Sequence, residues 1–188
     1  GFDLKKANEL AELSILATKA STLDAGQAVE FLLSATKQFR LEGEQLTAAL
    51  DGLVKSEDLS AVEAKDIADA FKTGGNSLAQ FGKDINESIG LISALREQTR
   101  KSGNEIGTFF KTLQTRIFAA GESRQALQEL GVSVQNLDGT LRPTLAVLND
   151  MKTAFDGLSE AQQANAAKAI AGVRQFEELI GTLNSLNR

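Results

Sequence analysis

Carboxylates and basic side chains are the main candidates for chemistry in this sequence, because histidine, cysteine, tyrosine and tryptophan are all absent. Without histidine, the usual general base and the commonest metal ligand are missing. Without cysteine, there is no thiolate ligand and no disulfide. Adjacent carboxylates such as Glu57-Asp58 and Glu177-Glu178 are expected on solvated surface, whereas catalytic carboxylates are usually buried. We therefore predict no catalytic residue, no cofactor, no metal site and no enzymatic activity.

Two glycine-containing segments resemble ligand loops only superficially. If Gly139 were the sixth residue of a calcium loop, Val134 and Leu145 would occupy the first and twelfth positions, where acidic ligands are needed. Gly74-Gly75 lacks the preceding strand and the following Lys-Ser/Thr of a phosphate-binding loop. We interpret the first as a reverse turn and the second as the end of a helix.

Basic residues gather between Ile89 and Ile117, where two acidic residues oppose them. A stripe of this kind could contact phosphates, but phosphate contact needs a larger basic surplus, and the chain carries a formal net charge of −5. A solvated helical face explains the charges, so no specific nucleic-acid partner is predicted. The basic residues concerned are Arg96, Arg100, Lys101, Lys111 and Arg116.

The segment 130–145 has a mechanical role at most of its positions. Gly131 can take the left-handed conformation that ends a helix. Two short strands are predicted, at residues 132–134 and at residues 140–142, which end at Arg142. Asp138-Gly139 is a reverse-turn signal between them. Pro143, the only proline, suits the first position of the next helix. The pattern predicts a helix, a small β-hairpin near residues 132–142, and another helix.

A further helix start follows at Ser159. Its hydroxyl and the amide of Gln162 have the spacing of a capping box, in which each side chain satisfies a backbone donor of the other residue. An alanine-rich helix then leads to Gly172 and Arg174.

This ordered set of features resembles the phage tail tape measure proteins. The resemblance covers about residues 20 to 186 and is most specific between Leu130 and Arg174; three upstream segments, 60–75, 89–96 and 102–113, also resemble the family. The residues that carry the most specific part are Val134, Gly139, Leu141, Arg142, Pro143, Leu158, Ser159, Gly172, Arg174 and Leu183.

The resemblance implies a non-enzymatic structural domain. Such proteins run along the lumen of the tail tube, set tail length during assembly and leave through the tip when genome ejection begins. The implied partners are tail-tube and tail-tip proteins, assembly chaperones and further copies of the protein itself. The implied locations are the virion and, during assembly, the host cytoplasm.

Helical periodicity dominates the rest of the chain. Apolar residues recur at helical spacing almost throughout, as in Ile106, Phe109, Phe110, Leu113 and Ile117. We expect an all-α fold, an irregular bundle of about nine short amphipathic helices. We expect a single domain over residues 1–188, with sub-halves 1–82 and 83–188. It should belong to a longer parent chain, because the sequence opens without an initiator methionine.

Serine and glycine positions predict the helix boundaries. Ser21 with Asp24 and Ser60 with Glu63 have the spacing of helix caps, and Gly74-Gly75 should end the helix that begins after Ser60. Gly103-x-x-x-Gly107 is a dimerisation motif only within apolar membrane spans. Since polar residues lie inside it here, we interpret it as a helix N-terminus.

Two other functions remain open at this point. One is a helical adaptor that binds a partner helix in a groove. The other is a membrane-active domain, in which membrane contact follows only after the helices open and expose Phe109, Phe110 and Ile117. The longest apolar runs are far below the roughly 20 residues that cross a bilayer.

Overall fold

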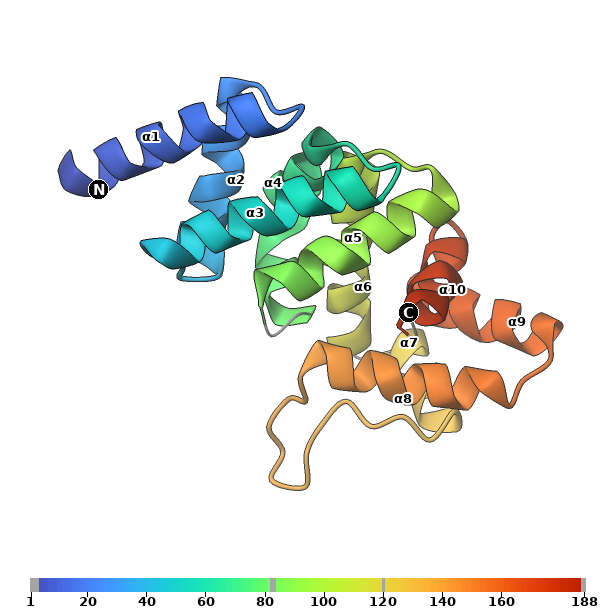
Figure 1. Cartoon of the computed structure of the whole chain (residues 1–188). Coiled ribbons are helices and arrows are strands. Elements are labelled where there is room, and N and C mark those ends of the chain that lie inside the picture. The colour runs from blue at the N-terminus through green and yellow to red at the C-terminus, as the bar shows by residue number, and fades with distance from the viewer. Residues whose placement is uncertain (1–3, 82–83, 120, 187–188) are drawn as a thin grey trace.

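Ten helices form the part of the chain that the computed structural model describes, residues 4–81, 84–119 and 121–186 (Figure 1). The all-α class is therefore confirmed, with ten helices in place of about nine. The helices are α1 (Leu4–Ala20), α2 (Ala25–Gln38), α3 (Glu44–Leu59), α4 (Ala64–Phe81), α5 (Ile85–Thr99), α6 (Gly103–Phe118), α7 (Glu122–Glu129), α8 (Thr144–Asp156), α9 (Glu160–Ala171) and α10 (Phe176–Ser185).

Helices α4 and α6 form the centre of the bundle. α2 packs on α4, and α1 packs on α2, so α1 and α2 lie toward one end of the molecule (Figure 1). α5 connects the central pair and also contacts α3 and α10. Helices α7 to α10 lie toward the other end, where α7 and α9 reach α6. The apolar stripe of α6 predicted from the sequence is fully buried: Ile106, Phe109, Phe110, Leu113 and Ile117 are each 0% exposed.

Aromatic contacts tie the middle and the end of α4 to different neighbours. Phe71 meets Phe31 of α2 at a centroid distance of 5.5 Å and Phe39, the residue after α2, at 5.6 Å. Phe81 meets Phe110 of α6 at 5.0 Å. These edge-to-face pairs add orientation preferences to the burial of apolar area.

The predicted helix end at Gly74-Gly75 is wrong, because α4 continues through both glycines to Phe81. Glycine lowers helix stability in isolation. Tertiary packing overrides that preference here, because both glycines lie against neighbouring helices, with Gly74 against the backbone of α6.

The β-hairpin predicted near residues 132–142 is also wrong. The described residues contain no strand, and a single antiparallel bridge joins Gln135 to Leu141. The turn itself is present, with Gly139 N donating to Asn136 O at 3.0 Å and Asn136 N donating to Thr140 O at 2.9 Å. Two short arms without a third strand are marginal as a sheet. The segment is therefore a loop that these hydrogen bonds hold in place, and we call it the pinned loop.

Several helix starts differ from their predicted positions. Pro143 is the residue before α8 rather than its first residue. Its φ of −54° is helical but its ψ of 136° is extended, so the first helical residue is Thr144. The capping box of Ser159 and Gln162 is present. The cap of α2 is Asp24 with Gln27 rather than Ser21, and Ser60 ends α3, its hydroxyl donating to Ser56 O at 2.6 Å.

We predict that Gly139→Val lowers the free energy of unfolding by about 1–3 kcal/mol. Gly139 has a φ of 84° and open space around its Cα, so the cost would come from backbone strain and not from a clash. Urea denaturation of the two proteins measures it. Gly90→Val is the control, because Gly90 lies inside α5 and also has open space around it. An unchanged denaturation midpoint for Gly139→Val would show that the turn does not need a positive φ at Gly139.

Candidate functional site

Glycines let the backbones of α4 and α6 touch. A Cβ atom on Gly107 would lie 2.6 Å from Ala70 O, and one on Gly74 would lie 2.5 Å from Gly107 O. A Cβ on Gly103 would be closer still to Asp66 O. Real Cβ atoms do not approach backbone that closely, so no residue larger than glycine fits at these three positions without moving a helix.

Contacts along this interface show that α4 and α6 run parallel. The start of α6 at Gly103 lies on Asp66, near the start of α4, and Gly107 lies on Ala70 one turn later. Farther along, Gln114 and Gln80 hydrogen-bond to each other. Small residues four positions apart therefore face each other in both helices, which brings the helices close together, as in GxxxG pairs of membrane helices.

The sequence prediction for Gly103-x-x-x-Gly107 is correct in one respect and incomplete in another. Gly103 is the first residue of α6, after the N-cap Ser102, so the motif does mark a helix start. Its packing role was missed. The signal that could have revealed it is the second pair of small residues at the same spacing, Ala70 and Gly74 in α4.

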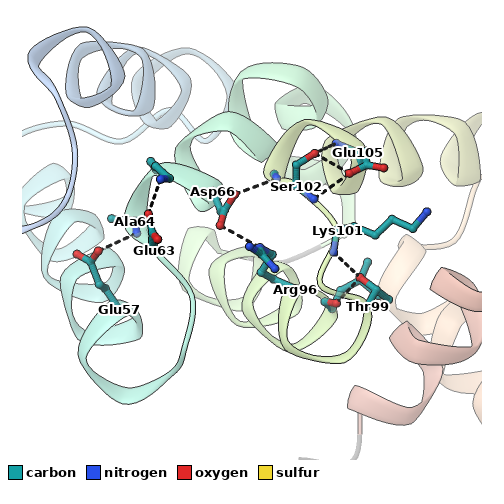
Figure 2. Close-up of polar contacts among 12 residues, drawn as sticks. Glu57, Glu63, Ala64, Asp66, Arg96, Thr99, Lys101, Ser102 and Glu105 are labelled. Atoms are coloured by element: carbon teal, nitrogen blue, oxygen red, sulfur yellow. Dashed lines mark hydrogen bonds and ion pairs between the residues drawn. The ribbon is translucent and has the colours of Figure 1, made fainter.

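Asp66 joins three helices at this interface (Figure 2). Its Oδ2 accepts from Nε of Arg96 in α5 at 2.9 Å, and its Oδ1 accepts from the backbone N–H of Gly103 at 3.3 Å. Asp66 is only 8% exposed. A buried carboxylate is costly unless it is paired, so the contact with Arg96 fixes α5 relative to α4 and the start of α6.

A second set of polar contacts follows in the turn between α5 and α6. Ser102 Oγ accepts from Glu105 N, and Ser102 N donates to Glu105 Oε2 at 2.9 Å, which completes a capping box (Figure 2). Hydrogen bonds from the Ser102 hydroxyl, and then from its backbone N–H, lower the pKa of Glu105. Beside it, Lys101 Nζ lies 3.0 Å from Oε1 of the buried Glu178 in α10. The hydrogen bond to Glu178 raises the pKa of Lys101.

Arg116 connects α6 to the C-terminal helices. Its Nε donates to Ile170 O at 2.7 Å and its Nη2 to Ala169 O at 3.0 Å. The Ser123 hydroxyl donates to the same Ile170 oxygen at 3.1 Å. Carbonyls at a helix C-terminus lack helical partners and attract cations, so Arg116 caps α9 from outside. No local pattern of residues indicates this contact, which joins residues 54 positions apart.

The five basic residues considered as a phosphate-binding stripe therefore fall into two groups. Arg96, Lys101 and Arg116 bind groups on other helices, which leaves Arg100 and Lys111 exposed on the surface. The main basic side chains of the segment connect helices.

Five predicted motif residues lie in the loop before α8, namely Gly131, Asp138, Gly139, Arg142 and Pro143. Gly131, with a φ of 74°, follows α7 and donates to Gln128 O at 2.9 Å. Asp138 accepts from the N–H and the hydroxyl of Thr140, at 2.9 and 2.6 Å, and these hydrogen bonds lower its pKa. Arg142 donates to Ser133 O at 2.8 Å and to Asp150 of α8 at 2.6 Å.

The other motif residues lie at the ends of α9, away from that loop. Ser159 caps its start, and Gly172, with a φ of 90°, ends it beside the Arg116 guanidinium. Arg174 is exposed and makes no hydrogen bond or ion pair within the described residues. The motif residues thus form helix ends and a pinned loop, and the fold does not bring them together into one site.

Two other kinds of site are absent from the described ranges. No group of three or more acidic side chains there is placed to hold a metal ion. None of the described helices combines the length and the apolarity that crossing a membrane requires. What the polar network of α4, α5 and α6 does is hold helices in fixed positions.

Comparison with known proteins gives the family. A family model described as phage-related minor tail protein matches residues 1–172. The chain belongs to this minor tail protein family. Among its relatives is the probable tape measure protein of Escherichia phage P2, 27% identical over 144 residues, which cover 75% of this chain and 18% of the relative. The tape measure protein of Pneumococcus phage Dp-1 is 23% identical over 163 residues, which cover 86% of this chain and 14% of the relative.

The predicted resemblance to tape measure proteins is confirmed by these matches. The chain spans less than a fifth of the length of either tape measure relative. No solved structure matches it significantly.

We predict that Gly107→Leu in this minor tail protein domain lowers the free energy of unfolding by about 3 kcal/mol or more, because overpacking moves helices apart. Gly90→Leu is the matched control: it adds the same side chain within a helix, but no atom lies within 4 Å of the new Cβ. Urea denaturation compares the two. Equal effects of the two substitutions would mean that helix contact at Gly107 is not limiting.

We predict that Ser102→Ala lowers stability by about 1 kcal/mol, as loss of an N-cap usually does, and returns the pKa of Glu105 toward its ordinary value of 4.5. The folded-state pKa of Glu105 is lowered, so its stabilising contribution is fully present above the unfolded pKa and is lost as pH falls through the folded one. NMR titration of Glu105 measures the shift. If the titration of Glu105 is the same in both proteins, the capping box does not hold this carboxylate.

Proposed function

We propose that this chain is a structural domain of a tail tape measure protein, contributing to tail assembly and length determination and leaving with the protein at genome ejection. The observation that carries this proposal is the family match over residues 1–172, together with two relatives named as tape measure proteins. A non-enzymatic role fits a family of tail proteins. The internal use of Asp66, Arg96, Lys101 and Arg116 supports it, since these charges connect helices.

The partners in this proposal are tail-tube and tail-tip proteins, assembly chaperones and further copies of the same protein. The locations are the virion and, before assembly is complete, the host cytoplasm. Within the parent protein, residues 1–188 would act as one helical domain, with sub-halves 1–82 and 83–188. The packing of α4 on α6 favours one unit, because these helices come from opposite sides of that division.

The length that this domain spans in a tail depends on whether it is extended or compact. As one continuous helix at 1.5 Å per residue, 188 residues would reach about 280 Å. As a compact domain the chain would have a radius of gyration of about 16 Å, hence a diameter of roughly 40 Å. A domain that stays folded would account for little of the tail's length, whereas one drawn out as helix inside the tube would account for much more.

Membrane contact after opening is the second candidate function. It would use the aromatic pair Phe109 and Phe110, which with Ile117 is fully buried in the closed domain. These side chains would reach a bilayer only if α6 left α4. An adaptor role would instead use a surface groove, such as the hollow of about 450 Å³ between α3 and α5 that Gly52, Leu59 and Ile89 help to line.

We predict that deleting residues 1–188 in frame from the tape measure gene of the parent phage shortens the tail. The shortening should be about 280 Å if the domain is drawn out as helix, or about 40 Å or less if it stays compact. Electron microscopy of purified tails measures this, and DNA release on receptor addition measures ejection. The matched control is Gly107→Leu in the intact gene, which keeps the number of residues and weakens the fold. Tails of normal length that also eject normally after the deletion would refute the proposed function.

A further inference from the structure

α4 carries its poorest helix-forming residues at its centre, where Thr73, Gly74, Gly75, Asn76 and Ser77 follow one another. Each glycine in a helix interior disfavours the helix about fivefold relative to alanine, and threonine, asparagine and serine are also weak helix formers. This run by itself predicts the end of a helix. The structure nevertheless keeps α4 unbroken from Ala64 to Phe81.

Contacts from two sides hold this central run. Gly74 lies against the backbone of Gly107, and Gly75 lies under the carboxamide of Gln38, where a Cβ atom would overlap the Gln38 oxygen. That oxygen, Oε1, is buried and has no hydrogen-bond partner. An unsatisfied buried acceptor is unfavourable. The centre of α4 is therefore both a weak helix and a place where packing comes at the expense of hydrogen bonding.

The aromatic contacts of α4 on either side of the glycines go to different elements, whereas Asp66 and Ala70 of the first part also touch α6. Before the glycines, Phe71 packs on Phe31 and Phe39 of the α2 region. After them, Phe81 packs on Phe110 of α6. Loss of α6 would thus remove the aromatic partner of the second part and the backbone partner of Gly74, and would leave the aromatic contacts of the first part in place.

We propose that Gly74-Gly75 is a built-in break point of α4. The helix is continuous only while α6 is docked. When α6 leaves, residues 64–73 stay helical against α2, and residues 76–81 unwind. The domain therefore opens at one defined place and releases α6 with its buried aromatic face. This property belongs to the chain itself and does not depend on the proposed role in the tail.

Native-state hydrogen exchange of the 188-residue chain, measured by NMR in increasing urea, tests the break point. The helical hydrogen bonds of amides 75–79 span the glycines, whereas those of amides 68–72 lie before them. We expect amides 75–79 to exchange through the same opening as amides 107–113 of α6, and at least about tenfold faster than amides 68–72, as two interior glycines imply. A single common opening for all of α4 would overturn the proposal.

A pair of variants tests the glycines directly. Gln38→Ala alone removes the side chain above Gly75, and Gln38→Ala with Gly75→Ala then places a methyl group in that space. We expect amides 75–79 to exchange about fivefold more slowly in the double variant than in Gln38→Ala, with amides 68–72 unchanged. Slowing of the same size in both groups of amides, or in neither, would show that the glycines do not define where α4 opens.

Discussion

Backbone contact between α4 and α6 requires facing positions without side chains, and the rest of the bundle is arranged around this requirement. With Gly103 and Gly107 against Asp66 and Ala70, the two helices are parallel neighbours, so the intervening α5 must return along the bundle to connect them. That return places Arg96 beside Asp66. The ion pair is thus a consequence of the glycine contact, and it also closes the turn where α6 begins.

Several charged side chains in this domain act on helix ends. Asp66 accepts from the first N–H of α6, Glu105 completes the cap of the same helix, and Arg116 donates to the last carbonyls of α9. Backbone groups at helix ends lack helical partners, and the ten helices of the described residues create many such ends. A fold of this kind therefore uses charges that in a different protein would be free for ligands.

Sequence patterns predicted what depends on local spacing. The buried stripe of α6, the capping box at Ser159 and the helix start at Gly103 follow from residues within a few positions of each other. What failed depends on distant partners. Gly74-Gly75 looked like a helix end because the partner of Gly74, Gly107, lies two helices farther along the chain. Residues 132–142 looked like a hairpin because pairing strength cannot be read from two short arms. The polar network of Asp66 and Arg96 gave no local signal at all.

The parallel arrangement of α4 and α6 also sets an order of events during synthesis. α4 ends at Phe81, and α6 is complete only at Phe118, so the ribosome must add residues 82–118 before the central contact can close. At typical translation rates of about 5–20 residues per second this takes roughly 2 to 7 seconds. Throughout that interval the face of α4 that receives α6 lacks its complete partner on the nascent chain, and the pace of translation decides when the centre of the bundle is fixed.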